Sequence, residues 1–148
     1  MRRRAAAVGA AILVVALAGC ATDDPAEIDA QASGAFDGLV AAAAEIDSAV
    51  LRTLSIDPAT TQSCGDGGEQ IIRSARGTVS VGAGVAQVAA LAELQFAGGA
   101  LDPERWDEID PAQPGVQRAW ADDDGIIATV RFEDPLLVIA VFSPCVDG

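Results

Sequence analysis

The sequence contains no histidine, no lysine and no tyrosine, and its single methionine is the first residue. The usual general bases near neutral pH and the amine nucleophiles are therefore missing. Without histidine, the common mixed cysteine–histidine metal sites are excluded as well. Only carboxylate chemistry remains for catalysis, so the first interpretation is a protein that is not an enzyme, and we expect no cofactor.

Long apolar runs are also missing, because the longest one, from Ala5 to Leu17, has only thirteen residues. A helix that spans a bilayer needs about 20. Arg2, Arg3 and Arg4 precede this run and small residues close it. A basic head, a short apolar body and a small-residue exit are typical of a secretory signal peptide, which is removed after export.

The apolar run ends in Leu17, Ala18, Gly19 and Cys20, and these four residues resemble the lipobox of bacterial lipoproteins. The resemblance implies cleavage before Cys20 and a diacylglyceryl group on its thiol. Two or more acyl chains make a stable membrane anchor, whereas one holds only reversibly. The alternatives are an ordinary cleaved signal with an accidental cysteine and an uncleaved N-terminal anchor. The sequence does not choose between export by the Sec route and export by the twin-arginine route.

These boundaries divide the chain into a signal peptide (1–19), a lipidated tether (20–24) and a single domain (25–148). We expect the domain on the outer face of the cell membrane, held there by the lipid on Cys20. Removal of the signal leaves six arginines and all 22 acidic residues, a formal charge of about −16. Because such a surface repels phosphates, we expect neither nucleic acid nor anionic lipid head groups as binding partners.

Three cysteines become an even number once the lipid takes Cys20. The remaining pair, Cys64 and Cys145, predicts a disulfide in an exported protein. A redox or metal-binding thiol pair is the alternative, but the sequence has no Cys-x-x-Cys spacing and no histidine to share a metal.

The first element of the domain is a predicted long helix that begins at Pro25. Asp24 can cap it, Pro25 suits the first helical position and Glu27 can close a capping box. Apolar residues then recur at steps of three and four, which predicts one amphipathic helix that ends before Pro58. The positions of this stripe are Ile28, Ala32, Phe36, Leu39, Ala43, Ile46, Val50 and Leu54.

The rest of the chain reads as strand, helix and strands. Residues 69–81 predict a strand, and residues 85–96 predict a second helix that Gly98 and Gly99 end. Residues 115–145 predict three apolar strands of an antiparallel meander, with turns at 122–125 and 133–135. The expected fold is therefore an α+β two-layer sandwich, with two helices packed on an antiparallel sheet of about four strands.

Two acidic segments are candidate sites. Around Trp106, a row of carboxylates beside an aromatic ring suggests a glycan-binding or carboxylate-dependent catalytic site, although a solvated acidic loop is the more common meaning; these carboxylates belong to Asp102, Glu104, Asp107, Glu108 and Asp110. Asp122, Asp123 and Asp124 are weak candidates for a calcium site. They lack the alternating ligands of an EF-hand loop, and an acidic turn explains them better.

The last predicted strand, Leu136–Phe142, is apolar on both faces instead of alternating. Its neighbour places Ile126, Ala128, Val130 and Phe132 on one side and Ile127, Thr129 and Arg131 on the other. If helices cover one face only, an apolar surface around Leu136, Val138 and Ile139 stays open for a partner or a ligand. A strand buried on both faces is the alternative.

The layout as a whole resembles the small, alanine- and arginine-rich lipoproteins of actinobacteria. In these proteins a lipobox precedes a helix, a cysteine-bearing loop, a strand, a second helix and strands that end at a second cysteine. The resemblance implies a lipid-anchored protein of the cell envelope and does not indicate its activity. The role we expect is a non-enzymatic binding or interaction module, whose partner is an unknown envelope protein or small ligand. The alternatives are a carrier with an apolar pocket between helix and sheet for a small ligand or lipid, and, third, the glycan or carboxylate site.

Overall fold

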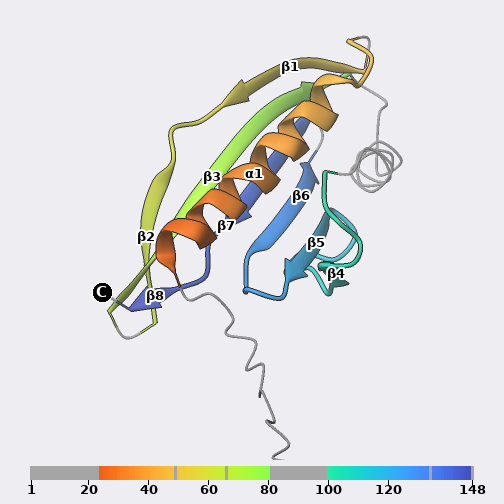
Figure 1. Ribbon diagram of the computed structural model, residues 1–148. Helices are drawn as coiled ribbons and strands as arrows, with labels where there is room; N and C mark the ends of the chain where they lie inside the picture. The colour runs from red at the N-terminus through yellow and green to blue at the C-terminus, as the bar shows by residue number, and fades with distance from the viewer. Residues whose placement is uncertain (1–23, 49, 66, 81–99, 134, 148) are drawn as a thin grey trace, which may run out of the picture.

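The computed structural model describes residues 24–48, 50–65, 67–80, 100–133 and 135–147. One helix and eight strands follow along these residues (Figure 1). They are α1 (Pro25–Ala44), β1 (Leu51–Ile56), β2 (Thr60–Cys64), β3 (Gly68–Val79), β4 (Trp106–Ile109), β5 (Gln117–Asp122), β6 (Ile127–Glu133), β7 (Leu136–Phe142) and β8 (Val146–Asp147).

The eight strands form one sheet, in which every strand pair is antiparallel. The order is β1-β3-β7-β6-β5-β4, and β2 and β8 both pair with the first half of β3. The prediction of two helices on a sheet of about four strands is therefore wrong. The described residues contain one helix and eight strands, and the second predicted helix, 85–96, lies outside them.

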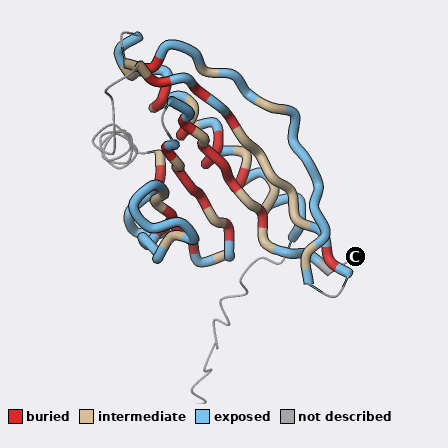
Figure 2. Tube along the Cα trace, turned by 180° about the vertical axis from the view of Figure 1, so that it is seen from behind, coloured by how far each residue is buried: buried red, intermediate tan, exposed pale blue. Residues whose placement is uncertain are grey.

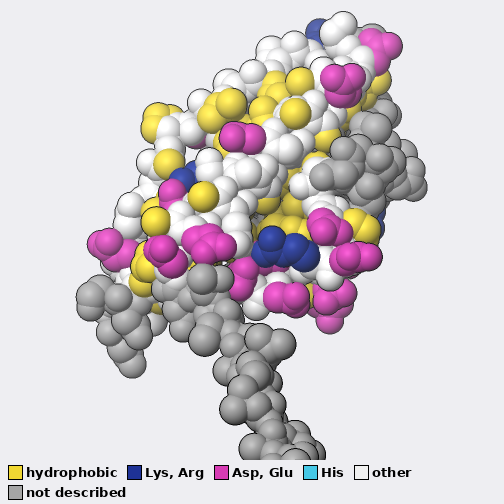
Figure 3. All heavy atoms as spheres, in the orientation of Figure 1, with side chains coloured by type: hydrophobic (Ala, Val, Ile, Leu, Met, Phe, Trp, Pro, Cys, Tyr) yellow, Lys and Arg dark blue, Asp and Glu magenta, His cyan; other side chains and the backbone are white. Residues whose placement is uncertain are grey.

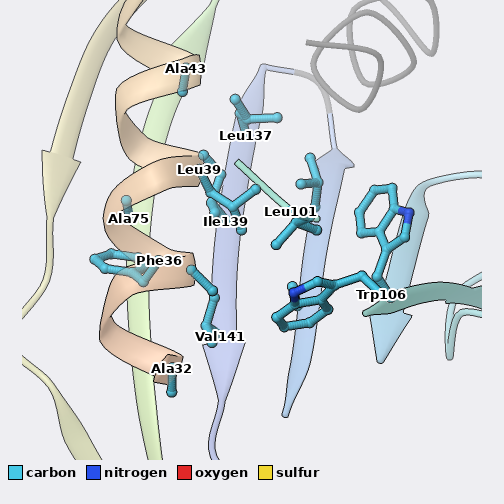
Figure 4. Close-up of a cluster of buried hydrophobic side chains, with 14 of the residues drawn as sticks. Ala32, Phe36, Leu39, Ala43, Ala75, Leu101, Trp106, Leu137, Ile139 and Val141 are labelled. Atoms are coloured by element: carbon cyan, nitrogen blue, oxygen red, sulfur yellow. The ribbon is translucent and has the colours of Figure 1, made fainter. Parts of the chain in front are cut away.

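Helix α1 begins as the sequence predicts. The Asp24 side chain caps it by accepting a hydrogen bond from the Ala26 backbone N–H at 3.0 Å, and Pro25 occupies the first turn. Four of the predicted stripe positions are buried and point at the sheet (Figure 4): Ala32, Phe36, Leu39 and Ala43. On the sheet they meet Leu137, Ile139 and Val141 of β7. Each large apolar side chain buried there stabilises the fold by about 1.5–3 kcal/mol.

The helix ends ten residues earlier than the apolar stripe predicts, at Ala44 instead of Leu54. Residues 51–56 form the edge strand β1, which pairs with β3. The register of this pair shifts between Leu51 and Thr53, so that Leu51 lies opposite Val79 and Leu54 opposite Gly77. The irregularity places two leucines that are three residues apart on the same sheet face. Their spacing therefore imitates the period of a helix.

Two further strands occupy segments that the sequence predicts as loops. Strand β2 lies between Pro58 and the glycine cluster, and it pairs with the start of β3 although most of its residues are exposed. Strand β4 lies in the acidic segment around Trp106 and pairs with β5. Both strands lie at sheet edges, where few side chains are buried and no apolar pattern forms.

The meander of the C-terminal segment is confirmed. Strands β5, β6 and β7 are adjacent and antiparallel. The turn between β5 and β6 contains Gly125 at φ 81°, in the left-handed region that glycine adopts without strain. The strand predicted within 69–81 is also present as β3.

The two faces of the sheet differ. The face covered by α1, which we call the inner face, holds the apolar core (Figure 4). The opposite face, which we call the open face, carries no helix among the described residues. Figure 2 views the molecule from this side and shows strands in front. Because side chains alternate along a strand, successive residues of β6 and β7 belong to different faces.

The described helix, α1, lacks the combination of length and apolarity that a bilayer-spanning helix requires.

Candidate functional site

The predicted lipidation site lies outside the described residues, since Leu17, Ala18, Gly19 and Cys20 all precede Asp24. The described chain begins four residues after Cys20. The cleavage and lipidation of this segment therefore stay predictions.

The predicted disulfide between Cys64 and Cys145 is confirmed, and their Cα atoms are 5.9 Å apart. It joins the end of β2 to the segment just before β8. Gly68 packs against it so closely that a Cβ atom there would lie 2.6 Å from the Cys145 sulfur. Glycine is therefore the residue that fits this position beside the disulfide.

The three residues of the predicted partner face do not share a face. Ile139 has no exposed surface and lies in the core beneath α1. Leu136, 36 % exposed, and Val138, half-buried, lie on the open face. The proposal of an exposed apolar surface therefore applies to Leu136 and Val138, and the buried-strand alternative applies to Ile139.

A groove of about 250 Å³ crosses the open face. We call it the open-face groove, and its lining residues are Ala112, Gln113, Gln117, Thr129, Arg131, Val138, Ala140 and Phe142. The strand register explains its shape, because Ala119, Thr129 and Ala140 form one row of small or short side chains across β5, β6 and β7. Larger residues flank this row on both sides.

The strand pattern alone could have pointed to part of this site, because it places Thr129 and Arg131 on the face opposite Val130. The contribution of Gln117 from β5, and of Ala112 and Gln113 from the segment before it, could not be found that way. These residues reach the groove only through the pairing of β5 with β6 and the path of the β4–β5 connection.

Two of the three candidate calcium ligands, Asp122 and Asp124, form hydrogen bonds and ion pairs that stabilise the turn that follows β5. The side chain of Asp122 is 1 % exposed, and its Oδ1 accepts hydrogen bonds from the backbone N–H groups of Asp124 at 3.0 Å and Ile126 at 2.8 Å. Arg105 Nη2 lies 3.4 Å from Asp122 Oδ2 and 3.1 Å from Asp124 Oδ2. Burial raises the pKa of the Asp122 carboxyl, although these hydrogen bonds act to lower it. Within the described residues, no group of three or more potential ligands is arranged to hold a metal ion.

The acidic segment around Trp106 does not present an aromatic surface. Trp106 is 8 % exposed and belongs to the core, next to Leu101 (Figure 4). Glu108 forms an ion pair with Arg118, whose Nε lies 2.9 Å from Glu108 Oε1. This pairing with Arg118 lowers the pKa of Glu108.

A cleft of about 230 Å³ beside α1 contains two carboxylates, those of Asp102 and Asp122. Both carboxylates accept hydrogen bonds from backbone N–H groups. Asp102 Oδ1 accepts one from Glu104 at 2.9 Å, and Asp122 Oδ1 accepts one from Ile126 in the turn after β5. Arg105 joins the cleft to the helix, because its Nη2 also lies 3.1 Å from Gln31 Oε1. Asp102, Asp122 and Arg105 therefore stabilise the backbone at this end of the sheet.

A third hollow, a cavity of about 270 Å³, lies between the first turns of α1 and the sheet. Its walls are mainly apolar, and its lining residues are Pro25, Ile28, Asp29, Thr61, Glu69, Ile71, Ser143 and Val146. It corresponds in position to the pocket expected for a small-ligand carrier.

Acidic side chains are spread over the α1 side of the molecule and gather near the end where α1 begins (Figure 3). The few arginines on the described surface are mostly paired with them. The pairs are Arg73 with Asp29, Arg76 with Asp57, Arg105 with Asp122 and Asp124, and Arg118 with Glu108.

Among the described residues, the protein is an antiparallel sheet with a helix on one face and a groove on the other. No protein-family model matches the sequence, and neither does any curated protein. A solved structure does match: a DUF4853 family protein from Actinomyces odontolyticus ATCC 17982, with a TM-score of 0.53 and 16 % identity. The match covers 82 % of this chain and 67 % of that one. At this identity the similarity establishes the fold alone, and its actinobacterial source agrees with the layout that the sequence suggested.

Proposed function

We propose that this protein is a lipid-anchored lipoprotein of the cell envelope that binds an envelope partner through the open face of its sheet. The observation that carries the binding role is the open-face groove, with Val138 and Phe142 in its lining and exposed Leu136 nearby. Apolar surface that a fold leaves uncovered usually marks a site of interaction.

The proposed location of the protein in the cell envelope rests on its sequence. The arginine triplet, the short apolar run and the Leu17–Cys20 motif support export and lipidation at Cys20. The tether between Cys20 and Pro25 spans at most about 18 Å when extended. The domain would therefore stand close to the outer surface of the membrane, and its partner is expected there.

Lipidation is tested by mass spectrometry of the N-terminus of protein isolated from producing cells. The expected result is a chain that begins at Cys20 and carries acyl groups. A Cys20→Ser variant should leave the membrane fraction. An unmodified or uncleaved N-terminus would contradict the anchor.

The binding role is tested by placing a photo-crosslinking amino acid at position 138 in the anchored protein in intact cells. The matched control carries the same amino acid at Asp37, which is exposed on α1. We expect one envelope component to be captured repeatedly from position 138 and not from position 37. Equal capture from both positions, or none from 138, would contradict a role of the open face.

A second function, carriage of a small ligand or lipid, is favoured by the apolar cavity beside the start of α1. Native mass spectrometry of the purified protein should then show a bound molecule. An Ile28→Trp variant, which fills the cavity from α1, should lose that molecule, whereas Val138→Asp on the open face should retain it. A wild-type protein free of bound mass would count against carriage.

A further inference from the structure

Arg131 differs from the other arginines of the described chain. Four of them pair with carboxylates, and Arg52 donates a hydrogen bond from Nε to Ser80 Oγ at 3.1 Å. For Arg131, no ion pair or hydrogen bond joins its guanidinium to any part of the chain that the structure describes. In a protein so rich in carboxylates, an arginine that meets neither a carboxylate nor another hydrogen-bond acceptor of the described chain is unexpected.

The position of Arg131 is the second observation. It is half-buried on β6 and lines the open-face groove. Across the sheet it lies between Gln117 on β5 and Val138 on β7. A partly desolvated charge costs free energy unless an opposite charge or hydrogen-bond acceptors meet it. A ligand that brings an anion into the groove would supply both.

The groove separates polar from apolar groups along the strands. Beyond the row of Arg131 comes the low row that contains Thr129 and Ala140, and then a row with Ile127 and Phe142. From the Arg131 row to the Phe142 row is about 13 Å, at about 3.3 Å per strand residue. The side chains of the middle row are small, so they leave space between the Arg131 row and the Phe142 row. An alkyl chain of a ligand could lie there along the strands.

The polar end suits a carboxylate. Arginine presents several N–H donors in a fork that matches the two oxygens of a carboxylate. Gln117 accepts a hydrogen bond from the Gln113 backbone N–H at 3.2 Å through its Oε1, so its amide nitrogen is a further donor. Glu133, two residues along the same face, is exposed and lies at the end of β6 away from the row of Phe142.

We propose that the open-face groove binds a small monocarboxylate with a short alkyl chain, the carboxylate at Arg131 and the chain over Ala140 toward Phe142. This proposal rests on the proposed function, because it names the ligand of the same open face. At about 250 Å³ the groove is below the 300–1,000 Å³ typical of sites for drug-sized ligands. A single short chain therefore fits it better than a two-chain lipid.

The test uses the full chain in membranes from producing cells and a photoactivatable octanoate with a diazirine near the end of its alkyl chain. The comparison probe is the alcohol of identical chain length, which is neutral. Labelled positions are located by mass spectrometry after proteolysis. We expect the carboxylate probe to label the segment 140–142, where the end of its alkyl chain lies, and excess octanoate to suppress this labelling.

Three variants isolate the role of the charge. Arg131→Gln should lower labelling of the groove by the carboxylate probe about tenfold, the loss expected for one charge-assisted hydrogen bond, and leave the alcohol probe unaffected. Arg131→Lys keeps the charge but lacks the fork, and it should lose less of the labelling than Arg131→Gln does. Arg52→Gln, which removes an equal charge on β1, should behave as wild type.

The results separate this proposal from the function on which it rests. Equal labelling of wild type and Arg131→Gln by the carboxylate probe overturns the anion site, as does labelling confined to the cavity beside Pro25. If in those cases crosslinking from position 138 still captures an envelope component, the binding role of the open face stands. If position 138 captures nothing and neither probe labels the groove, both proposals fail.

Discussion

At the scale of single residues, neighbours in the chain have opposite surroundings. Val138 and Ile139 are both aliphatic and adjacent in sequence, yet Val138 lines the open-face groove while Ile139 has no exposed surface. The alternation of a strand separates them, and only the position of α1 decides which of the two is covered.

This difference gives a matched pair of variants. Val138→Asp should lower the free energy of unfolding by about 1 kcal/mol or less, since the carboxylate can reach water. Ile139→Asp buries a charge without a partner in the core and should cost more than about 4 kcal/mol or prevent folding. Urea denaturation followed by circular dichroism measures both. Similar losses from the two variants would mean that the open face is covered.

Asp122 provides a prediction of pH dependence. Because burial raises the pKa of its carboxyl above the ordinary 3.8, the folded state binds the proton more tightly than the unfolded state does. Its contribution to stability is therefore greatest below the ordinary pKa and is lost as the pH rises through the raised pKa. The advantage of wild type over Asp122→Asn in free energy of unfolding should fall between pH 3 and pH 7.

Urea denaturation of both proteins at pH 3, 5 and 7 tests this. The subtraction matters because Glu108, with a pKa lowered by Arg118, contributes in the opposite direction, gaining stability as the pH rises. A wild-type advantage that grows with pH would contradict the assignment to Asp122.

At the scale of elements, α1 contains two glycines with different surroundings. A Cβ atom at Gly34 would meet nothing within 4 Å, whereas one at Gly38 would lie 3.3 Å from the carbonyl oxygen of Ala100. Gly38 therefore lets the segment at residue 100 approach the helix closely. At Gly34, no contact in the described structure requires glycine.

Gly34→Ala should raise the free energy of unfolding by about 0.5–1 kcal/mol, because alanine favours the helix by that amount. Gly38→Ala has the same gain in helix propensity, but the contact with backbone at residue 100 should cancel or reverse it. Thermal unfolding of the two variants compares them directly. An equal gain for both would mean that the segment at residue 100 does not pack on α1.

The element boundaries also show where sequence patterns fail. The start of α1 follows from local chemistry at Asp24 and Pro25. Its end does not, because the register shift in β1 gives Leu51 and Leu54 the spacing of a helix. Strand β2 contains no buried residue and β4 contains only one, Trp106, so their sequences carry no apolar pattern. Hydrogen bonds to β3 and β5 hold them in the sheet.

At the scale of the whole molecule, the disulfide links parts of the chain that are 81 residues apart. It fastens the edge strand β2 to the C-terminal segment, on either side of β3. A crosslink over so long a loop reduces the entropy of the unfolded chain substantially.

Replacing Cys64 and Cys145 together by serine should lower the free energy of unfolding by about 2–5 kcal/mol. Urea denaturation with and without reductant measures the change. Reductant should bring wild type close to the variant and leave the variant unchanged. A wild type that is insensitive to reductant would show that the bond contributes little.

The sequence by itself determined the features that depend on local chemistry or on simple counting: the capped start of α1, the strand β3, the β5–β6–β7 meander and the cysteine pair. The tertiary structure decided the number of strands, the end of α1, and which sheet face α1 covers. It also brought Gln117, Arg131 and Val138 into one row on the open face. These features depend on pairing between distant segments, and a local pattern of residues does not record which strand will lie beside it.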